Sequence, residues 1–247
     1  MAYNLLKGKR GIIFGALNDL SIAWKVAERA VEEGAEIVLT NTEISLRMGE
    51  ISKLAERCNA PIIVADATKV EDLEALVDKA MEHFGGKFDF VLHSVGMSPN
   101  VRKSIPYQSL NYTFLDRTLD ISAVSFHKVL QVLYAKDALN EWGSVVALTY
   151  MAAQRTFIGY SDMADAKALL ESVARSFGAI YGRDRKVRVN TVSQSPTYTT
   201  AGKGIAGMGG MLETQNAAPL TQKTSRASLY CPLSFSRVDS IRPRQNG

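Results

Sequence analysis

Six short apolar runs, separated by segments with helical spacing, are the feature that most constrains how this chain of 247 residues can fold. The runs are rich in valine and isoleucine and nearly continuous, which is typical of strands buried on both faces. Strands that alternate with helices predict a parallel sheet with right-handed crossovers. The expected strands are RGIIFG (10–15), AEIVLT (35–40), PIIVAD (61–66), FDFVLHS (88–94), GSVVALT (143–149) and VRVNTVS (187–193).

The intervening segments carry apolar residues three and four positions apart, which predicts helices. The sequence therefore predicts an α/β fold, a doubly wound parallel sheet of the Rossmann type in a single domain. Ligands of such folds bind at the carboxyl ends of the strands. The expected helices are 21–33, 44–57, 70–84, 111–139 and 160–182.

Composition and charge exclude several classes of protein. The net charge of +4 equals the net charge of residues 221–247 alone, so residues 1–220 are neutral and lack the basic face of a nucleic-acid binder. Two cysteines and three scattered histidines make neither a disulfide framework nor a metal site. No run approaches the ~20 apolar residues of a membrane span, and the amino-terminal residues lack a signal-peptide pattern. We expect a cytoplasmic protein without metal, nucleic-acid or membrane partners.

The stretch GALNDLSIAWKVA (15–27) follows the first expected strand, where a dinucleotide-binding loop would lie. The usual fingerprint has three glycines, whereas here Gly15 stands alone. Gly15 provides a tight turn, the Ser21 hydroxyl lies near the helix start, and Ile22 offers a backbone N–H to a phosphate. The alternative is that Ser21 only caps the helix.

The ends of the next three expected strands carry further candidates. Thr42 precedes the acidic Glu43 at the place where an acidic residue binds the ribose of NAD, which favours NAD over NADP. Asp66 can accept a hydrogen bond from an adenine amino group or cap the next helix. In HSVG (93–96), Gly96 allows close backbone approach to a ribose or is a simple turn glycine.

Tyr150, Tyr160 and Lys167 are the strongest candidates for chemistry. Tyr150 closes the fifth expected strand, and the seven-residue step from Tyr160 to Lys167 would place both on one face of a helix that includes Tyr160. A lysine near a phenol lowers its pKa and makes it a better proton donor. The alternative is a surface lysine beside two half-buried tyrosines.

Together these residues resemble the short-chain dehydrogenase/reductase superfamily and, within it, the NADH-dependent enoyl-acyl-carrier-protein reductases. That branch opens with a strand, one glycine and an LSIA helix start, and has Ser-x-Gly after the fourth strand, matched by Ser94 and Gly96. Its two tyrosines, and a lysine separated from the second by six residues, match Tyr150, Tyr160 and Lys167. Ketone reductases of the superfamily have a serine near the first position and only three residues before the lysine.

The resemblance implies reduction of trans-2-enoyl thioesters on acyl carrier protein in fatty acid biosynthesis, with NADH preferred to NADPH. Tyr160 would bind the thioester oxygen, Lys167 would hold the nicotinamide ribose, and Tyr150 would orient the thioester or relay a proton. The implied cofactor-binding residues are Gly15, Ser21, Ile22, Thr42, Asp66, Ala67, Ser94, Val95, Gly96, Lys167, Thr197 and Thr199. The implied substrate-binding residues are Met97, Tyr150, Tyr160, Ile205 and Met208.

The carboxyl-terminal segment departs from the family pattern. The likeness covers residues 7–220 and then stops. We therefore set the limits of the reductase domain at 1–220. The family's next helix and last strand are missing from the basic tail, 221–247, which indicates a shifted frame or a truncation, or else a lineage-specific tail. The loss would put the family's tetramer in doubt and lower stability. The glycine- and methionine-rich 201–211 is expected to be a lid, or a plain surface loop, with Lys203 facing the carrier protein.

Two alternatives to enoyl reduction remain open at this stage. One is a short-chain reductase that acts on ketones, against which the tyrosine–lysine spacing argues. The other is a non-catalytic nucleotide-binding paralogue, which the altered tail favours.

Overall fold

One sheet of five parallel strands, in the order β2-β1-β3-β4-β5, organises the computed structural model of the chain. The structure describes residues 2–156, 159–194, 197 and 199. The expected α/β class and doubly wound parallel sheet are confirmed. The strands are β1 (Arg10–Phe14), β2 (Glu36–Thr40), β3 (Phe88–His93), β4 (Leu139–Tyr150) and β5 (Arg188–Gln194).

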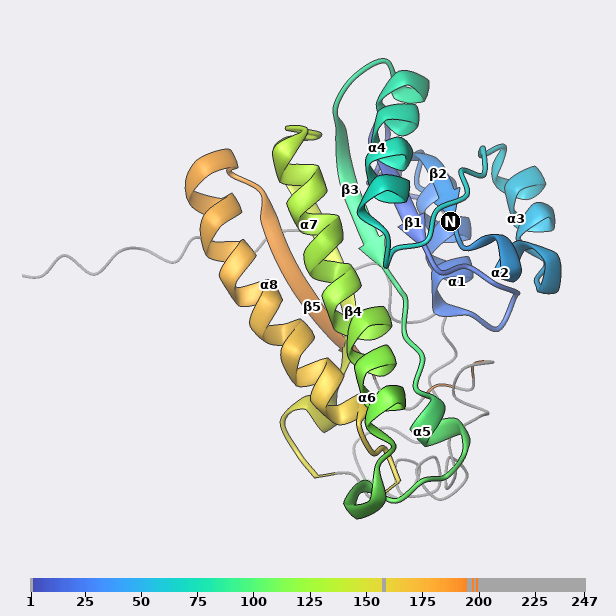
Figure 1. Ribbon diagram of the computed structural model, residues 1–247. Coiled ribbons are helices and arrows are strands. Elements are labelled where there is room, and N and C mark those ends of the chain that lie inside the picture. Colours follow the sequence, from blue (N-terminus) through green and yellow to red (C-terminus); the bar gives the residue numbers. More distant parts are fainter. Residues whose placement is uncertain (1, 157–158, 195–196, 198, 200–247) are drawn as a thin grey trace, which may run out of the picture.

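Helices cover both faces of the sheet because alternate strand residues point to opposite sides. Ile12 and Phe14 of β1 belong to the core cluster under α4, α7 and α8, whereas Ile13 belongs to the cluster under α1 and α3. Figure 1 shows α4, α7 and α8 along one face and α1 on the other. These helices are α1 (Ile22–Glu32), α3 (Ile51–Cys58), α4 (Val70–Phe84), α7 (Ser125–Ala135) and α8 (Met163–Arg185).

The prediction of a strand over 61–66 is wrong, and the described sheet has five strands rather than six. The segment makes a single parallel bridge, Ile62 to Leu39 of β2, with the amide of Leu39 bonded to the Pro61 carbonyl. Proline has no N–H to donate, and Val64 of the segment is half exposed, so a regular strand is not sustained there.

The prediction of one helix over 44–57 is also wrong, because the helix is interrupted between α2 (Glu43–Met48) and α3. Gly49 lies directly under Leu17 of the loop after β1, where an added Cβ would stand 2.7 Å from the Leu17 carbonyl oxygen. The next amide, of Glu50, donates to that same oxygen at 2.8 Å. The break therefore supports the loop in which we expected a nucleotide.

The two longest predicted helices also differ from the structure. The segment 111–139 becomes α6 (Tyr112–Leu119), a π-helical turn η2 (Asp120–Val124) and α7, and residue 139 already starts β4. The segment 160–182 becomes α8, so Tyr160 precedes the helix. No helix in the described part of the chain is long and apolar enough to cross a membrane. The remaining short elements are α5 (Pro99–Arg102), η1 (Tyr107–Ser109) and η3 (Met151–Ala153).

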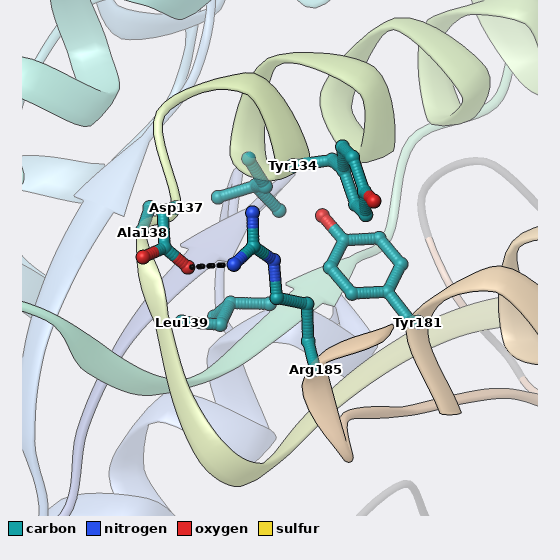
Figure 2. A pocket seen from close by; sticks show the side chains of 7 residues that line it. Tyr134, Asp137, Ala138, Leu139, Tyr181 and Arg185 are labelled. Carbon is teal, nitrogen blue, oxygen red and sulfur yellow. Dashed lines mark ion pairs between the residues drawn. The ribbon is translucent and has the colours of Figure 1, made fainter. Parts of the chain in front are cut away.

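Aromatic and charged side chains fasten α7, α8 and the start of β4 together at the amino-terminal end of the strands (Figure 2). The Arg185 guanidinium lies 5.2 Å from the Tyr134 ring centroid and 3.4 Å from an Asp137 carboxylate oxygen. The Tyr181 ring meets Tyr134 edge-on, with centroids 5.3 Å apart. This corner fixes the end of α8 opposite to the one that carries Lys167.

Candidate functional site

Gly15 brings the loop after β1 into contact with the loop after β3. Its φ of +88° lies in the left-handed region, and an added Cβ would stand 2.0 Å from the backbone oxygen of Ser94. Only glycine fits this close approach of two backbones. Two candidate cofactor-binding residues from separate strands therefore lie side by side at the carboxyl edge of the sheet.

Ser21 secures the loop rather than the helix. Its hydroxyl accepts from the amide of Leu17 at 3.1 Å and donates to the carbonyl of Asn18 at 2.6 Å. Although Ser21 occupies the N-cap position of α1, its side chain makes no capping hydrogen bond. The alternative of a simple cap is therefore wrong, and the first N–H groups of α1, including that of Ile22, are left for an anion.

The end of β2 is tied to the opening loop by Asn41, a residue that the sequence reasoning missed. Its amide nitrogen donates to the Ala16 carbonyl at 3.0 Å. Thr42 caps α2 by accepting from the Ser45 amide at 3.3 Å. Glu43 pairs with Arg47 at the surface. The Arg47 guanidinium, which would attract a 2′-phosphate, is therefore already paired with the Glu43 carboxylate.

Asp66 is engaged locally instead of capping α4. One carboxylate oxygen accepts from the Thr68 amide at 2.9 Å and from the Thr68 hydroxyl at 2.7 Å. The N-cap of α4 is Lys69, so the alternative of an Asp66 helix cap is wrong. The methyl group of Ala67 is buried in the core, so any contact of Ala67 with a base would be through its backbone.

Tyr150 and Tyr160 pack against each other at the end of β4. Their ring centroids are 4.9 Å apart, and both rings are more than nine-tenths buried in a cluster with Met163. Burial, with a contribution from Tyr150, raises the pKa of Tyr160 above its ordinary value. Burial also raises the pKa of Tyr150. The expectation that Lys167 lowers the Tyr160 pKa is wrong here, because desolvation of a buried phenolate dominates.

Lys167 lies beneath the loop that follows β3. Its ammonium donates to the Leu148 carbonyl at 2.8 Å, and burial lowers its pKa to about 8. A Cβ built on Gly96 would stand 3.6 Å from the Lys167 nitrogen and 3.9 Å from the Met163 Cε. The structure thus brings Gly96, Lys167 and the tyrosine pair to one edge, although Tyr160 reaches it from a turn and not from the predicted helix.

Comparison with known proteins identifies the family. A sequence model described as enoyl-(acyl carrier protein) reductase matches residues 15–228. The chain belongs to the enoyl-acyl-carrier-protein reductase family. The crystal structure of a FabI–NADH complex from Alistipes finegoldii is 68% identical, with a TM-score of 0.88, over 92% of this chain and 80% of that one.

Curated members of the enoyl-acyl-carrier-protein reductase family are more distant in sequence. The NADH-type reductase 2 of Rhizobium meliloti is 34% identical over 85% of this chain and 77% of its own length. The NADH-type reductase FabI of Rickettsia bellii is 33% identical over 91% of this chain and 84% of its own.

The structure describes only some of the remaining expected site residues. Thr197 and Thr199 are described and half-buried, just beyond β5. Ile205, Met208, Lys203, the expected lid and the tail 221–247 lie outside the described residues. Met97 is half-buried, and its amide donates to the Ser122 hydroxyl of η2 at 3.0 Å.

Two buried polar residues lie next to the site of this enoyl-acyl-carrier-protein reductase: Glu171, which the sequence reasoning missed, and His93, one of the three scattered histidines. Glu171 of α8 accepts from the Thr149 hydroxyl at 2.8 Å and from the Gln154 amide at 3.1 Å, which secures the backbone on both sides of Tyr150. His93, fully buried, contacts the Ser125 hydroxyl at 3.0 Å, and burial lowers its pKa to about 3. In the described part of the chain no group of three acidic, histidine or cysteine side chains could hold a metal ion.

Proposed function

We propose that this chain catalyses the NADH-dependent reduction of the carbon–carbon double bond of trans-2-enoyl thioesters carried by acyl carrier protein, in fatty acid biosynthesis. The observation that carries the proposal is the convergence of Tyr150, Tyr160 and Lys167 beside Gly96 at the carboxyl edge of the sheet. Family membership and the Alistipes FabI–NADH complex support the same reaction and cofactor.

The described residues fit a dinucleotide. The uncapped start of α1 and the tight turn at Gly15 suit a pyrophosphate, since helix N-termini bind anions through free N–H groups. Of Ser94, Val95 and Gly96, the exposed Gly96 lies over the Lys167 nitrogen, where a ribose would lie. Glu43 beside Thr42 disfavours a 2′-phosphate, which supports NADH over NADPH.

NADH, when bound, supplies the hydride to the β-carbon of the enoyl thioester. Negative charge then develops on the thioester oxygen, and the Tyr160 hydroxyl donates a hydrogen bond to it. Because burial raises the Tyr160 pKa, the phenol stays protonated at neutral pH and remains a donor. Lys167 holds the ribose and keeps the local potential positive. Tyr150, in ring contact with Tyr160, orients the thioester or relays a proton.

The partner and the location follow from the same proposal. We propose that the protein acts on acyl carrier protein in the cytoplasm as a homo-oligomer, for which the altered tail puts the family's tetramer in doubt. The substrate-binding residues are Met97, Tyr150 and Tyr160, with Ile205 and Met208 from the expected lid. We set the reductase domain at 1–220 and leave 221–247 as a tail outside the family's sequence pattern.

Loss of NADH absorbance tests the function directly. The purified full chain is expected to oxidise NADH with a short trans-2-enoyl thioester, more slowly with NADPH, and not with a 3-ketoacyl thioester. Turnover of the ketone instead would assign the protein to the ketone reductases. A folded sample that binds NADH without any turnover would favour the non-catalytic paralogue.

The pH dependence of kcat/KM tests the role of Lys167. Its pKa of about 8 means that the ammonium form, which holds the positive charge, predominates below pH 8 and is lost above it. We expect kcat/KM for NADH to be level from pH 6.5 to 7.5 and to fall toward tenfold per pH unit above about pH 8, since this ratio reports groups of the free enzyme. The Lys167→Met variant is expected to have a low kcat/KM at every pH, without the decline above pH 8. A wild-type profile level to pH 9.5 would exclude this role.

A further inference from the structure

The carboxylate of Asp162 is fully buried at the edge of the site without having been assigned any part in the reaction. Asp162 follows Tyr160 by two residues and immediately precedes α8, which carries Lys167. Its exposed fraction is 0%. Burying a carboxylate is costly unless hydrogen bonds replace its water, so its partners indicate what it stabilises.

Three uncharged donors, two at the start of α5 and one in α6, converge on Asp162. The Ser98 hydroxyl donates to Oδ1 at 2.6 Å, while the Asn100 amide and the Thr118 hydroxyl contact Oδ2 at 2.7 and 2.8 Å. Ser98 is also the N-cap of α5, where it accepts from the Val101 amide at 3.0 Å. Asp162 therefore joins the start of α8 to α5 and α6.

Ser98 directly continues the loop that contains Gly96 and Met97. Met97 is held by Ser122, whose hydroxyl accepts from its amide. Asp162 holds the side chain of the next residue, Ser98. The backbone over Lys167 is thus fixed between two buried polar contacts, one of which comes from the turn that carries Tyr160.

The turn that carries Tyr160 needs such support. Ser161 has a φ of +47°, a conformation that residues with a side chain rarely adopt and that persists when the surroundings impose it. Its hydroxyl donates to the Ile105 carbonyl at 3.3 Å, and the Tyr160 carbonyl accepts from the Met163 amide at 3.2 Å. With the Asp162 contacts, the turn is held against 98–118 at its strained residue and at the residue that follows.

We infer that Asp162 is a positioning residue that fixes the Tyr160 phenol relative to the Gly96–Met97 loop, where cofactor and substrate meet. The inference rests on the proposed function for its consequence, because the position of Tyr160 matters only if its hydroxyl meets the thioester oxygen. Misplacement by about 1 Å can cost up to about a hundredfold in rate.

The first test compares Asp162→Asn with Asp184→Asn, a matched control at the other end of α8 whose carboxylate accepts from the Tyr134 hydroxyl. Asp162→Asn is expected to lower kcat by at least about tenfold while NADH affinity changes by less than about twofold. In a Tyr160→Phe background the same substitution should change kcat by less than about twofold, since residues that act through one group are not additive. An undiminished kcat, or a full effect in that background, would overturn the inference.

Variants of the donors keep the test decisive if Asp162→Asn does not fold. Thr118→Val removes the hydroxyl that bonds both Asp162 and the Phe114 carbonyl and is expected to lower kcat several-fold, whereas Thr118→Ser keeps that hydroxyl and restores kcat. Equal kcat for both would contradict the inference.

Tyrosine ring NMR with a ¹³C label separates this inference from the proposed function. The Tyr160 signal, assigned by its loss in Tyr160→Phe, should shift or broaden in Asp162→Asn and stay in place in Asp184→Asn. This result is independent of turnover, so an inactive wild type would refute the function alone. An unmoved Tyr160 signal would refute the positioning role alone.

Discussion

Tyr160→Phe is expected to lower kcat for enoyl-thioester reduction by about 100- to 1,000-fold, while the protein still folds and binds NADH. Removing one preorganised donor from a developing oxyanion typically costs about 3–4 kcal/mol of barrier. Phenylalanine preserves the ring, so the contact with Tyr150 at 4.9 Å is retained. The measurement is steady-state NADH oxidation with a short trans-2-enoyl thioester, alongside NADH binding by fluorescence.

Tyr181→Phe is the matched control for this prediction. Tyr181 is buried in α8, and its hydroxyl donates to the Leu130 carbonyl at 2.9 Å, far along the helix from Lys167. Losing that bond should lower the free energy of unfolding by about 1 kcal/mol and leave kcat unchanged. If Tyr160→Phe retains wild-type kcat, the thioester oxygen has another donor, and Tyr150→Phe becomes the decisive variant.

The sheet was predictable because buried parallel strands leave a strong pattern in the sequence. Ile12, Ile13 and Phe14 form a continuous apolar run whose alternate members fill two separate cores, which only a strand covered on both faces requires. The run at 61–66 has the same composition but not the same structure. There the segment makes a single bridge to β2, because Pro61 has no N–H to extend the ladder, and the apolar pattern alone overestimates the number of strands.

The sequence predicted which residue types form the site better than it predicted their geometry and pKa values. Spacing alone suggested that Tyr160 and Lys167 share a helix, yet the positive φ of Ser161 puts Tyr160 in a preceding turn. The partners of Asp162 are 44 to 64 residues away along the chain, so no local pattern announces that contact. The raised Tyr160 pKa likewise follows from burial, which the sequence does not give residue by residue.

Gly15→Ala is expected to lower the free energy of unfolding by about 2–5 kcal/mol and to weaken NADH binding by at least about tenfold. A left-handed φ costs a residue with a side chain about 1–2 kcal/mol, and overpacking adds about 1–3 kcal/mol. The added Cβ would stand 2.0 Å from the Ser94 carbonyl oxygen and 2.8 Å from its carbon. Both atoms are backbone, so no side chain can move aside, and the Ser94–Gly96 loop itself must shift.

Gly85→Ala separates the clash from the conformational strain. Gly85 also has a left-handed φ, +69°, but an added Cβ there meets nothing within 4 Å. This control should lose only about 1–2 kcal/mol and bind NADH normally. Urea unfolding and fluorescence titration of the two variants measure the difference. Equal stability and equal NADH affinity would mean that the loops after β1 and β3 can separate without cost, and that their close approach at Gly15 does not shape the cofactor site.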